Sequence, residues 1–372
     1  MPKEKIAFIS LLKPVDDIRS YRKMARSLSS MTGCEIHLFG YPSKSTLTDE
    51  CNIFFHPQRT FRRLGLIRFF IPLIILRSLI KLKPKLIIVN SHELLIVTII
   101  NQILFGTRIV YDIQENYYYN LWYQQVYPPI LRHLMAIMIR CKERLLAPFF
   151  DHFFLAEKCY QEELSFVQSR SILIENKALP LSKIYPRSAN KTNTTTLLFS
   201  GTITQNTGID KALELTKSLQ TMGDFELLVT GHCPVPALYN RLNKMEAPWL
   251  RLNISQTPLP YTVIEQAIVT ADIGLICYQL NPSNQRCMPT KVYEYAAQGL
   301  PMLYEKDTHW ETFIEEHAKG AVIDFKSKNE VALNDVLIQV QEFKSKERKT
   351  CDAAMWIHEE QSFLSLMQSL LS

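Results

Sequence analysis

The sequence lacks the short motifs that mark the commonest metal, phosphate and disulfide sites. Its eight cysteines form no C-x-x-C pair and no Cys/His cluster with zinc spacing. The 372 residues also contain no D-x-D, G-x-G-x-x-G or Walker sequence. We therefore expect no metal site and no resident cofactor. Scattered cysteines are typical of reduced thiols packed as small apolar groups, and no apolar signal core follows Met1, so we expect a cytoplasmic protein.

Acidic residues are missing from a long stretch of the first half, between Glu50 and Glu93. Within it, the segment 59–85 (RTFRRLGLIRFFIPLIILRSLIKLKPK) carries positive charges at Arg59, Arg62, Arg63, Arg68, Arg77, Lys81, Lys83 and Lys85. Its longest uncharged run, FFIPLIIL, is far too short to span a bilayer. A cationic helix with a bulky apolar face instead predicts peripheral contact with an anionic membrane, on its inner face. The alternative is a helix that covers a sheet and whose arginines are simply solvated.

An aromatic run, NYYYNLWYQQVYPP (116–129), follows this segment. Tyr and Trp favour interfaces with one wet side, so the run supports membrane contact, but a sugar-stacking surface or ordinary packing has the same composition. Nucleic acid is not an expected partner, because the basic residues accompany aliphatic ones rather than a recognised binding module.

Charge is divided unevenly along the chain. Residues 1–185 hold 25 Lys and Arg against 15 Asp and Glu, a net charge of +10, whereas the remainder holds 17 against 21, a net charge of −4. A basic half joined to a mildly acidic half indicates that the two halves meet different partners.

Short apolar runs alternate with helical patterns from end to end, which is typical of α/β proteins with parallel sheets. The expected strands are 6–10, 34–40, 52–56, 85–91, 108–114, 152–156 and 171–176, then 196–201, 225–231, 250–255, 273–278, 301–305 and 321–325. We predict two doubly wound Rossmann-like domains facing across a cleft. The predicted divisions are 1–178 for the N-terminal domain, 179–195 for a Pro-, Ser- and Asn-rich linker, 196–355 for the C-terminal domain, and 356–372 for a helix packing back toward the N-terminal domain.

The stretch 287–301, CMPTKVYEYAAQGLP, predicts a short helix with chemistry at its start. The Pro-Thr pair suits a helix beginning, and Gly-Leu-Pro suits its end. Lys291 would add a full charge to the unpaired amides of the helix N-terminus, which is a good environment for a diphosphate. Glu294, one turn later, could accept hydrogen bonds from the two hydroxyls of a ribose. The pattern predicts a nucleotide site; the alternative is a surface ion pair worth only ~0.2–0.5 kcal/mol.

A second segment, LLFSGTITQNTGIDKALEL (197–215), has the pattern of a strand, a glycine turn, a polar loop and a helix. Gly201 permits close approach of a ligand to the backbone, and the Thr202 hydroxyl can donate to an anion. Most turns of this kind bind nothing, so the segment is informative only in combination with 287–301.

The sequence P-T-K-V-Y-E-Y-A-A-Q-G-L-P resembles the nucleotide-sugar signature of GT-B glycosyltransferases, and most of all the large retaining group called family 4 or group 1. LLFSGTI with Gly208 is similar to the first strand and loop of that family's C-terminal domain, and TADIGLICY to the strand before the signature. IIVNSHELL and IVYDIQEN resemble its N-domain segments, often written H-x-H-D and Y-D-x-H-E. This resemblance covers most of the chain and implies a C-terminal domain that binds a nucleotide sugar and an N-terminal domain that binds the acceptor.

The resemblance also implies roles for residues at matching positions. Glu294 would bind the ribose, Lys291 and Thr290 would face the diphosphate, and the Gly201–Thr202 turn would lie beside it. The acceptor-side residues that it implies are Arg19, His92 and Glu93. Each of them follows the carboxyl end of an expected strand, where ligands bind in such sheets, although a lone histidine is often a structural residue.

Three positions depart from the family pattern. Arg286 stands where a glutamate commonly precedes the ribose glutamate by eight positions, Thr207 replaces the lysine of K-G, and Gln114 replaces the histidine of Y-D-x-H-E. We predict that Arg286 binds the donor and, with Lys291, supplies the phosphate charge that Thr207 cannot.

The predicted reaction transfers a sugar from a nucleotide-diphosphate sugar to a hydroxyl of a glycan or lipid-linked acceptor, in cell-envelope polysaccharide or glycolipid synthesis. It would proceed without a metal, driven by electrostatic stabilisation of the leaving diphosphate, and the family likeness implies retention of configuration. Asp112 and Glu115 are candidates for the catalytic residue, but a carboxylate after a strand is as often structural. Two alternatives remain, a GT-B-type nucleotide-sugar epimerase and a degenerate, non-catalytic GT-B subunit that binds a glycan or scaffolds a complex.

Overall fold

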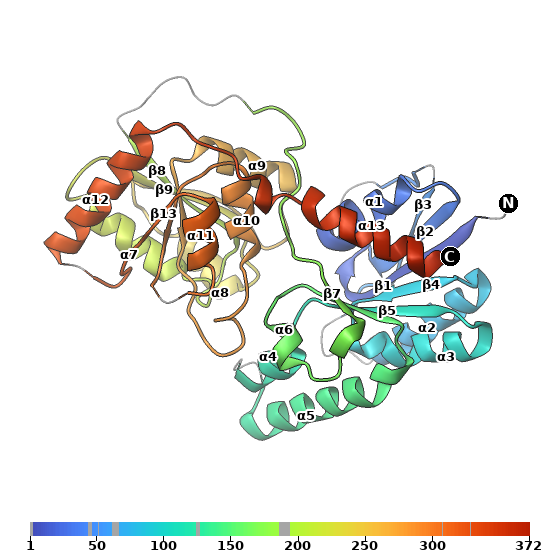
Figure 1. Cartoon of the computed structure of the whole chain (residues 1–372). Helices are drawn as coiled ribbons and strands as arrows, with labels where there is room; N and C mark the ends of the chain where they lie inside the picture. Colours follow the sequence, from blue (N-terminus) through green and yellow to red (C-terminus); the bar gives the residue numbers. More distant parts are fainter. Residues whose placement is uncertain are drawn as a thin grey trace. The chain divides into compact units, whose positions relative to one another are not determined.

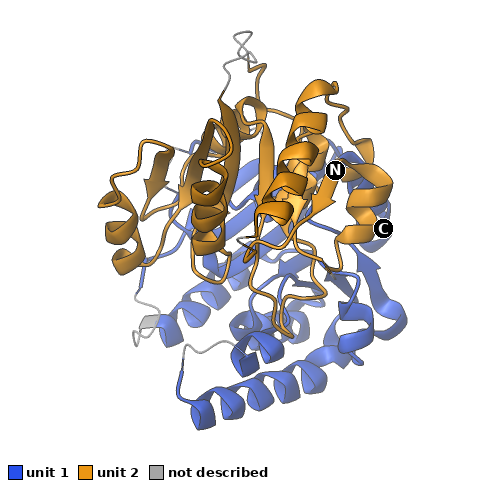
Figure 2. Ribbon diagram, turned by 90° about the vertical axis from the view of Figure 1, so that its left-hand side faces the viewer, with its two compact units in different colours: residues 1–176, 357–372 blue, residues 177–356 orange. Residues whose placement is uncertain are grey.

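The computed structural model describes residues 3–43, 47–50, 52–61, 67–123, 127–185, 194–306, 308–327 and 329–372. The chain divides into two compact units (Figure 2): unit 1 is Met1–Asn176 with Ile357–Ser372, and unit 2 is Lys177–Trp356. The last segment of the chain therefore belongs to unit 1, although unit 2 precedes it in sequence. Of the predicted linker, residues 186–193 lie outside the described residues.

Unit 1 is built on one parallel sheet, in which the described chain contributes seven strands in the order β3-β2-β1-β4-β5-β6-β7. The strands are β1 (Glu4–Pro14), β2 (Cys34–Tyr41), β3 (Ile53–Pro57), β4 (Leu86–Val89), β5 (Arg108–Ile113), β6 (His152–Leu155) and β7 (Ser171–Leu173). The central strands are almost wholly buried, as expected for a parallel sheet with helices on both faces.

The helical segments of unit 1 follow the strands that they connect. They are η1 (Ile18–Ala25), α1 (Arg26–Ser29), α2 (Ile67–Leu82), η2 (His92–Leu94), α3 (Leu95–Phe105), α4 (Tyr117–Tyr123), α5 (Pro129–Leu146), η3 (Ala147–Phe149), α6 (Tyr160–Glu163) and η4 (Gln168–Arg170). The basic segment thus contains a helix, α2, whereas Arg62 and Arg63 lie outside the described residues. The first part of the aromatic run forms α4, whose Trp122 stacks on His133 of α5 with ring centres 4.1 Å apart. In the part of the chain that the structure describes, no helix is both long enough and apolar enough to cross a membrane.

The last helix, α13 (Ile357–Leu371), packs onto unit 1 (Figure 1). Phe363 lies edge-on against Phe154 of β6, with ring centres 5.7 Å apart. At the end of the helix, the Arg108 guanidinium donates to the Leu370 carbonyl over 2.8 Å, so a cation lies where the helix dipole favours one.

Unit 2 repeats the architecture with a six-stranded parallel sheet in its described residues, in the order β10-β9-β8-β11-β12-β13. Its strands are β8 (Thr195–Thr202), β9 (Phe225–His232), β10 (Leu250–Ser255), β11 (Ile273–Ile276), β12 (Met302–Tyr304) and β13 (Gly320–Val322). Its helices are α7 (Ile209–Leu219), α8 (Pro236–Asn243), α9 (Tyr261–Thr270), α10 (Thr290–Ala297), α11 (Glu311–His317), α12 (Glu330–Ser345) and η5 (Asp352–Ala354).

The two faces of the unit 2 sheet have separate cores, because successive strand side chains point to opposite faces. Leu197 and Phe199 pack with α7 and α12, whereas Leu198 packs with α9 and α10. The predicted α/β class with two Rossmann-like sheets is confirmed, and every expected strand overlaps an observed one. The helix predicted from 287–301 is also present, as α10.

Candidate functional site

In unit 2, the strand order changes direction between β8 and β11. The chain runs outward from β8 through β9 to β10 on one side, and from β11 through β12 to β13 on the other. Ligands of such sheets bind beyond the carboxyl ends of the strands at this switch point. The residues that follow β8 and β11 are therefore the first place to look for a site.

Helix α10 is held beside this switch point by Tyr295. The Tyr295 and Ser200 hydroxyls lie 2.8 Å apart, and a Cβ atom on Gly274 would lie 2.4 Å from the Tyr295 ring. The bare glycine of β11 therefore lets α10 approach the sheet closely. This contact fixes the position of the helix N-terminus, where Lys291 is the second helical residue.

Lys291 is 5 % exposed, and its Nζ atom has no hydrogen-bond partner among the described residues. The atom lies 4.6 Å from the centre of the Phe199 ring, on β8, and 5.0 Å from that of Tyr278, just after β11. Burial lowers the pKa of Lys291 to about 8, against smaller opposing effects of Cys277 and Glu294. Aromatic rings stabilise a buried cation only partly. A bound anion would therefore stabilise the charged form of Lys291 further.

The other predicted residues of α10 lie toward its outside. Thr290, the first helical residue, is exposed, and Glu294 is half-buried. The Tyr261 hydroxyl donates to Glu294 Oε1 over 3.2 Å. Lys291 and Glu294 thus occupy successive turns of one helix, and Glu294 is accessible enough to accept a further hydrogen bond.

The last residues of β8 have a backbone shape that only glycine allows. Gly201 has a φ of 91°, and a Cβ atom on Gly231, at the end of β9, would lie 1.9 Å from the Gly201 carbonyl oxygen. Thr202 is exposed directly beyond this close contact. Gly231 was not singled out from the sequence, although its place at the end of FELLVTG was a usable signal.

Thr207, which replaces the family lysine, closes the loop on itself. The Thr204 amide donates to Thr207 Oγ1 over 2.9 Å, and Thr207 Oγ1 donates to the Thr204 carbonyl over 3.0 Å. The loop is tied to the segment after β11 by a hydrogen bond of 2.8 Å from the Gln279 amide to the Asn206 carbonyl. The segments around Gly201, Tyr278 and Lys291 are therefore brought together.

Two further cations lie in this region. Lys211, in the first turn of α7, pairs with Glu305 at 2.6 Å and was not predicted from the sequence. Arg286 is half-buried, in the turn-rich segment between β11 and α10, where the Ser283 hydroxyl donates to Asn281 Oδ1 over 2.6 Å. Arg286 thus lies five residues before the buried ammonium of Lys291.

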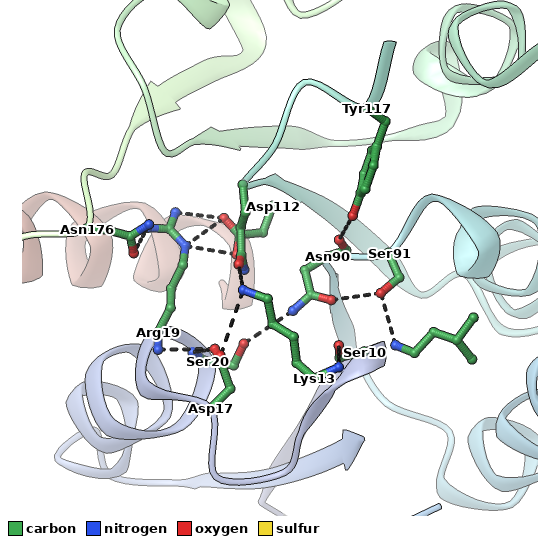
Figure 3. Close-up of polar contacts among 12 residues, drawn as sticks. Ser10, Lys13, Asp17, Arg19, Ser20, Asn90, Ser91, Asp112, Tyr117 and Asn176 are labelled. Carbon is green, nitrogen blue, oxygen red and sulfur yellow. Dashed lines mark hydrogen bonds and ion pairs between the residues drawn. The ribbon is translucent and has the colours of Figure 1, made fainter. Parts of the chain in front are cut away.

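In unit 1, Arg19 and Asp112 bind each other (Figure 3). Arg19 Nη2 lies 2.7 Å from Asp112 Oδ1, and Nε donates to both carboxylate oxygens at 3.0 and 3.1 Å. Arg19 Nη1 also donates to the Ile174 carbonyl over 2.7 Å. Both side chains are nearly fully buried. The pair joins η1 to the end of β5 and to the chain after β7, so Arg19 faces Asp112 rather than solvent.

Gln114, which replaces the family histidine, lies next to this pair. Its Nε2 donates to Asp112 over 2.5 Å, and its Oε1 accepts a hydrogen bond from the Lys13 ammonium. Lys13 remains partly exposed and was not predicted from the sequence. Glu115 is exposed and accepts a hydrogen bond of 2.9 Å from Asn120, so of the two carboxylate candidates it is the accessible one.

Asn90 and Ser91, after β4, complete this edge of the sheet. The Leu11 amide donates to Ser91 Oγ over 2.9 Å, and Ser91 donates to Asn90 Oδ1 over 3.1 Å. The Tyr117 hydroxyl donates to the Asn90 carbonyl over 3.1 Å, as Figure 3 shows. The carboxyl ends of β1, β4 and β5 therefore share one polar network.

His92 and Glu93 form a second group in unit 1. Burial lowers the pKa of His92 to about 4, so its ring is neutral near pH 7 and Nδ1 can accept a hydrogen bond from the Lys142 ammonium, whose Nζ lies 3.0 Å away. The net effect on Glu93 is a lowered pKa: burial raises it, but His92 and the ion pair with Arg68 outweigh burial. Every titratable group of this cluster thus has a partner within unit 1.

Comparisons with solved structures place the fold. A sucrose-phosphate synthase from Thermosynechococcus elongatus matches with a TM-score of 0.68 at 14 % identity, covering 99 % of each chain. A glycosyltransferase from Rickettsia africae ESF-5 matches at 0.66 and 10 % identity, covering 100 % of this chain and 99 % of that one. A protein described as a UDP-N-acetylglucosamine 2-epimerase, from Listeria monocytogenes, matches at 0.59 and 12 % identity, covering 99 % and 96 %.

These structures share the GT-B fold, and the chain has that fold. No family model matches the sequence, and no curated protein matches it. At identities of 10–14 % the likeness concerns the fold alone, and the fold is common to transferases and an epimerase. What the protein does must be argued from its residues.

Proposed function

We propose that this protein is a glycosyltransferase that moves a sugar from a nucleotide-diphosphate sugar to a hydroxyl group of a glycan or lipid-linked acceptor. The observation that carries the proposal is Lys291, a buried ammonium at the switch point of unit 2 without a hydrogen-bond partner among the described residues. A buried cation without a partner costs free energy, so its presence requires an explanation. A diphosphate bound at the start of α10 supplies one.

The donor would be held along the first two turns of α10. The helix N-terminus, the Thr290 hydroxyl and Lys291 bind the diphosphate, and Glu294 accepts hydrogen bonds from the ribose hydroxyls. The end of β8, at Gly201 and Thr202, would lie beside the diphosphate. Arg286, five residues before Lys291, adds a second positive charge, which Thr207 lacks and cannot supply from within its own loop.

Sugar transfer would then depend on electrostatics. The barrier lies in charge that develops on the leaving diphosphate, and preorganised cations in a buried site stabilise such charge effectively. Lys291 and the helix dipole would serve this purpose without a metal ion, and the likeness to the retaining family favours retention of configuration. Glu115 is the better of the two catalytic candidates, because Asp112 is occupied by Arg19.

Unit 1 would bind the acceptor. His92 and Glu93 lie after β4 and near Tyr117, whose ring contacts His92 edge-on with centres 4.7 Å apart. Arg19 would act on the acceptor indirectly, by holding Asp112 and Gln114 in place. Contact of residues 59–85 with the inner face of an anionic membrane would bring a lipid-linked acceptor to the protein, as expected in cell-envelope polysaccharide or glycolipid synthesis.

A donor panel tests the proposal. Purified protein is titrated calorimetrically with UDP-, GDP- and ADP-sugars, and slow release of the nucleoside diphosphate is followed by chromatography. We expect one nucleotide series to bind, and Lys291→Ala and Arg286→Ala each to weaken its binding at least tenfold. Arg251→Ala is the matched control, since Arg251 is exposed on β10 and pairs with Glu226. Unchanged affinity of the Arg286 variant would remove Arg286 from the site.

The products separate this proposal from its rivals. A transferase releases nucleoside diphosphate slowly in water and faster with an acceptor. An epimerase converts the nucleotide sugar into its epimer with the diphosphate still attached, and a non-catalytic subunit does neither. Failure to bind or hydrolyse any member of the panel would contradict the enzymatic function.

A further inference from the structure

One face of the unit 1 sheet is covered by α2, α3 and α5, whereas α1 and α13 lie on the other (Figure 1). The outer sides of the three helices are apolar. Their most exposed large apolar side chains are Phe69, Phe70 and Leu73 on α2, Ile96, Ile103 and Leu104 on α3, and Ile130, Met138 and Leu145 on α5. More than half of the exposed large apolar side chains of the described chain fall between residues 69 and 149.

Helix α3 is the clearest case, because its sequence, LIVTIINQILF, has no charged residue. Ile96, Ile100, Ile103 and Leu104 recur at helical spacing on its outer side, and Ile103 is 73 % exposed. A helix that faces water normally carries charged or polar residues on this side. An exposed apolar stripe of this kind marks a surface that something covers.

The three helices are neighbours, so their stripes belong to one surface. Helix α3 packs directly on α2. Its last turn is joined to η3, which directly follows α5, by a hydrogen bond of 2.9 Å from Gln102 Nε2 to the Phe149 carbonyl. We refer to the outer sides of α2, α3 and α5 together as the three-helix face.

The charges of the three-helix face have one sign. Arg77 and Lys81 of α2 and Arg144 of α5 are exposed, and Lys83, just after α2, lies over the Phe105 ring at 5.4 Å. The single acid within the three helices, Glu143, is 2 % exposed. Exposed apolar side chains accompanied by exposed cations match an anionic lipid surface, in which the apolar side chains reach the acyl boundary and the cations meet headgroups.

Charge also argues against a second copy of this chain as the partner. Two copies of the three-helix face would bring Arg77, Lys81 and Arg144 toward the same cations of the other copy, and no exposed acid of these helices would compensate them. An anionic bilayer offers the opposite charge together with an apolar interior, so it satisfies both features of the face.

We propose that the three-helix face is a membrane-docking surface, with the uncharged stripe of α3 inserted into the acyl boundary of an anionic bilayer. The surface is thus wider than the basic segment 59–85 and has its apolar anchor outside that segment. The proposal does not depend on sugar transfer, because every contact that carries it lies on the outer sides of α2, α3 and α5.

Co-sedimentation of the full-length protein with vesicles tests the proposal. We expect binding to phosphatidylcholine vesicles that contain phosphatidylglycerol, little binding to phosphatidylcholine alone, and weaker binding as salt is raised. Ile96→Glu with Ile103→Glu should lower the partition coefficient at least tenfold. Arg77→Glu with Lys81→Glu should remove the preference for anionic vesicles. The matched control is Val331→Glu with Ile338→Glu, two exposed apolar residues of α12 in unit 2.

Thermal melts of all variants confirm that each is folded before lipid binding is compared. Equal lipid binding by the α3 variant and the α12 control would overturn the proposal, as would a wild-type protein that ignores anionic vesicles. Dimerisation of the wild type in light scattering, lost in the α3 variant, would instead make the face a contact between copies and overturn it too. Donor hydrolysis measured without lipid separates the two proposals, because lipid binding without hydrolysis contradicts only the proposed function.

Discussion

The ammonium of Lys291 lies over the Phe199 ring, with Nζ 4.6 Å from the ring centre and no hydrogen-bond partner among the described residues. Burial without a partner destabilises the charged form, so Lys291 costs the free protein stability near neutral pH. We predict that Lys291→Met raises the free energy of unfolding by about 1–3 kcal/mol while abolishing donor binding. Chemical denaturation and calorimetric titration measure the two effects. If Lys291→Met is less stable than the wild type, the buried charge of Lys291 does not destabilise the free protein, and this argument for an anion site fails.

The same residue predicts a pH dependence. Its pKa is about 8 in the folded protein and 10.5 in the unfolded chain, so the unfolded chain binds more protons between these values. The wild-type free energy of unfolding should therefore rise as pH increases from 8 to 10.5, by up to about 3 kcal/mol from this residue. Lys291→Met should lack this rise. The measurement is chemical denaturation of both proteins across that pH range. If the free energies of unfolding of the wild type and of Lys291→Met rise equally with pH, the rise comes from another group.

Glu294 offers a test of the ribose contact alone. Glu294→Gln keeps the size of the side chain and its contact with Tyr261 but removes the charge that strengthens two hydrogen bonds. We expect nucleotide-sugar affinity to fall about tenfold or more, which corresponds to at least ~1.4 kcal/mol. Binding of inorganic diphosphate, which has no ribose, should be unchanged. An equal loss for both ligands would place Glu294 elsewhere in the site.

The sequence was sufficient to predict the strands and α10, because apolar alternation and helix-boundary residues are local signals. It could not predict the pairing of Arg19 with Asp112, which lie 93 positions apart, or of Lys211 with Glu305, 94 apart. Such partners meet only once the sheet order is fixed. The exposure of α3 was hidden for a different reason, since an uncharged helical run is usually a sign of burial.

The Arg19–Asp112 pair predicts a large loss of stability when one partner is removed. Asp112→Asn would leave a buried guanidinium without its counter-charge, and we expect a loss of about 3–5 kcal/mol in the free energy of unfolding. The double variant Arg19→Met with Asp112→Leu should lose much less, because it buries no charge. Urea denaturation of Arg19→Met, Asp112→Leu and their combination gives the coupling energy of the pair. If the two single losses simply add in the double variant, the pair does not act as a unit.

Substitution of Gly208, at the start of α7, tests how tightly the loop after β8 is packed against the end of β11. It has a φ of 90°, and a Cβ atom there would lie 1.8 Å from the Cys277 carbonyl oxygen. Gly33 is a matched control, because its φ is 86° but a Cβ atom would meet nothing within 4 Å. Gly33→Ala should cost about 1 kcal/mol for the backbone conformation alone.

Gly208→Ala adds the steric conflict to that backbone cost, since the Cys277 carbonyl must move together with the chain leading to Tyr278. We expect a loss of stability of about 3 kcal/mol or more, and weaker donor binding in whatever fraction folds. Thermal unfolding of the two alanine variants, compared at the same pH, provides the measurement. If Gly33→Ala and Gly208→Ala lose equal stability, the chain after β11 moves away from the added Cβ atom at little cost. The loop after β8 would then not be a preformed part of the donor site.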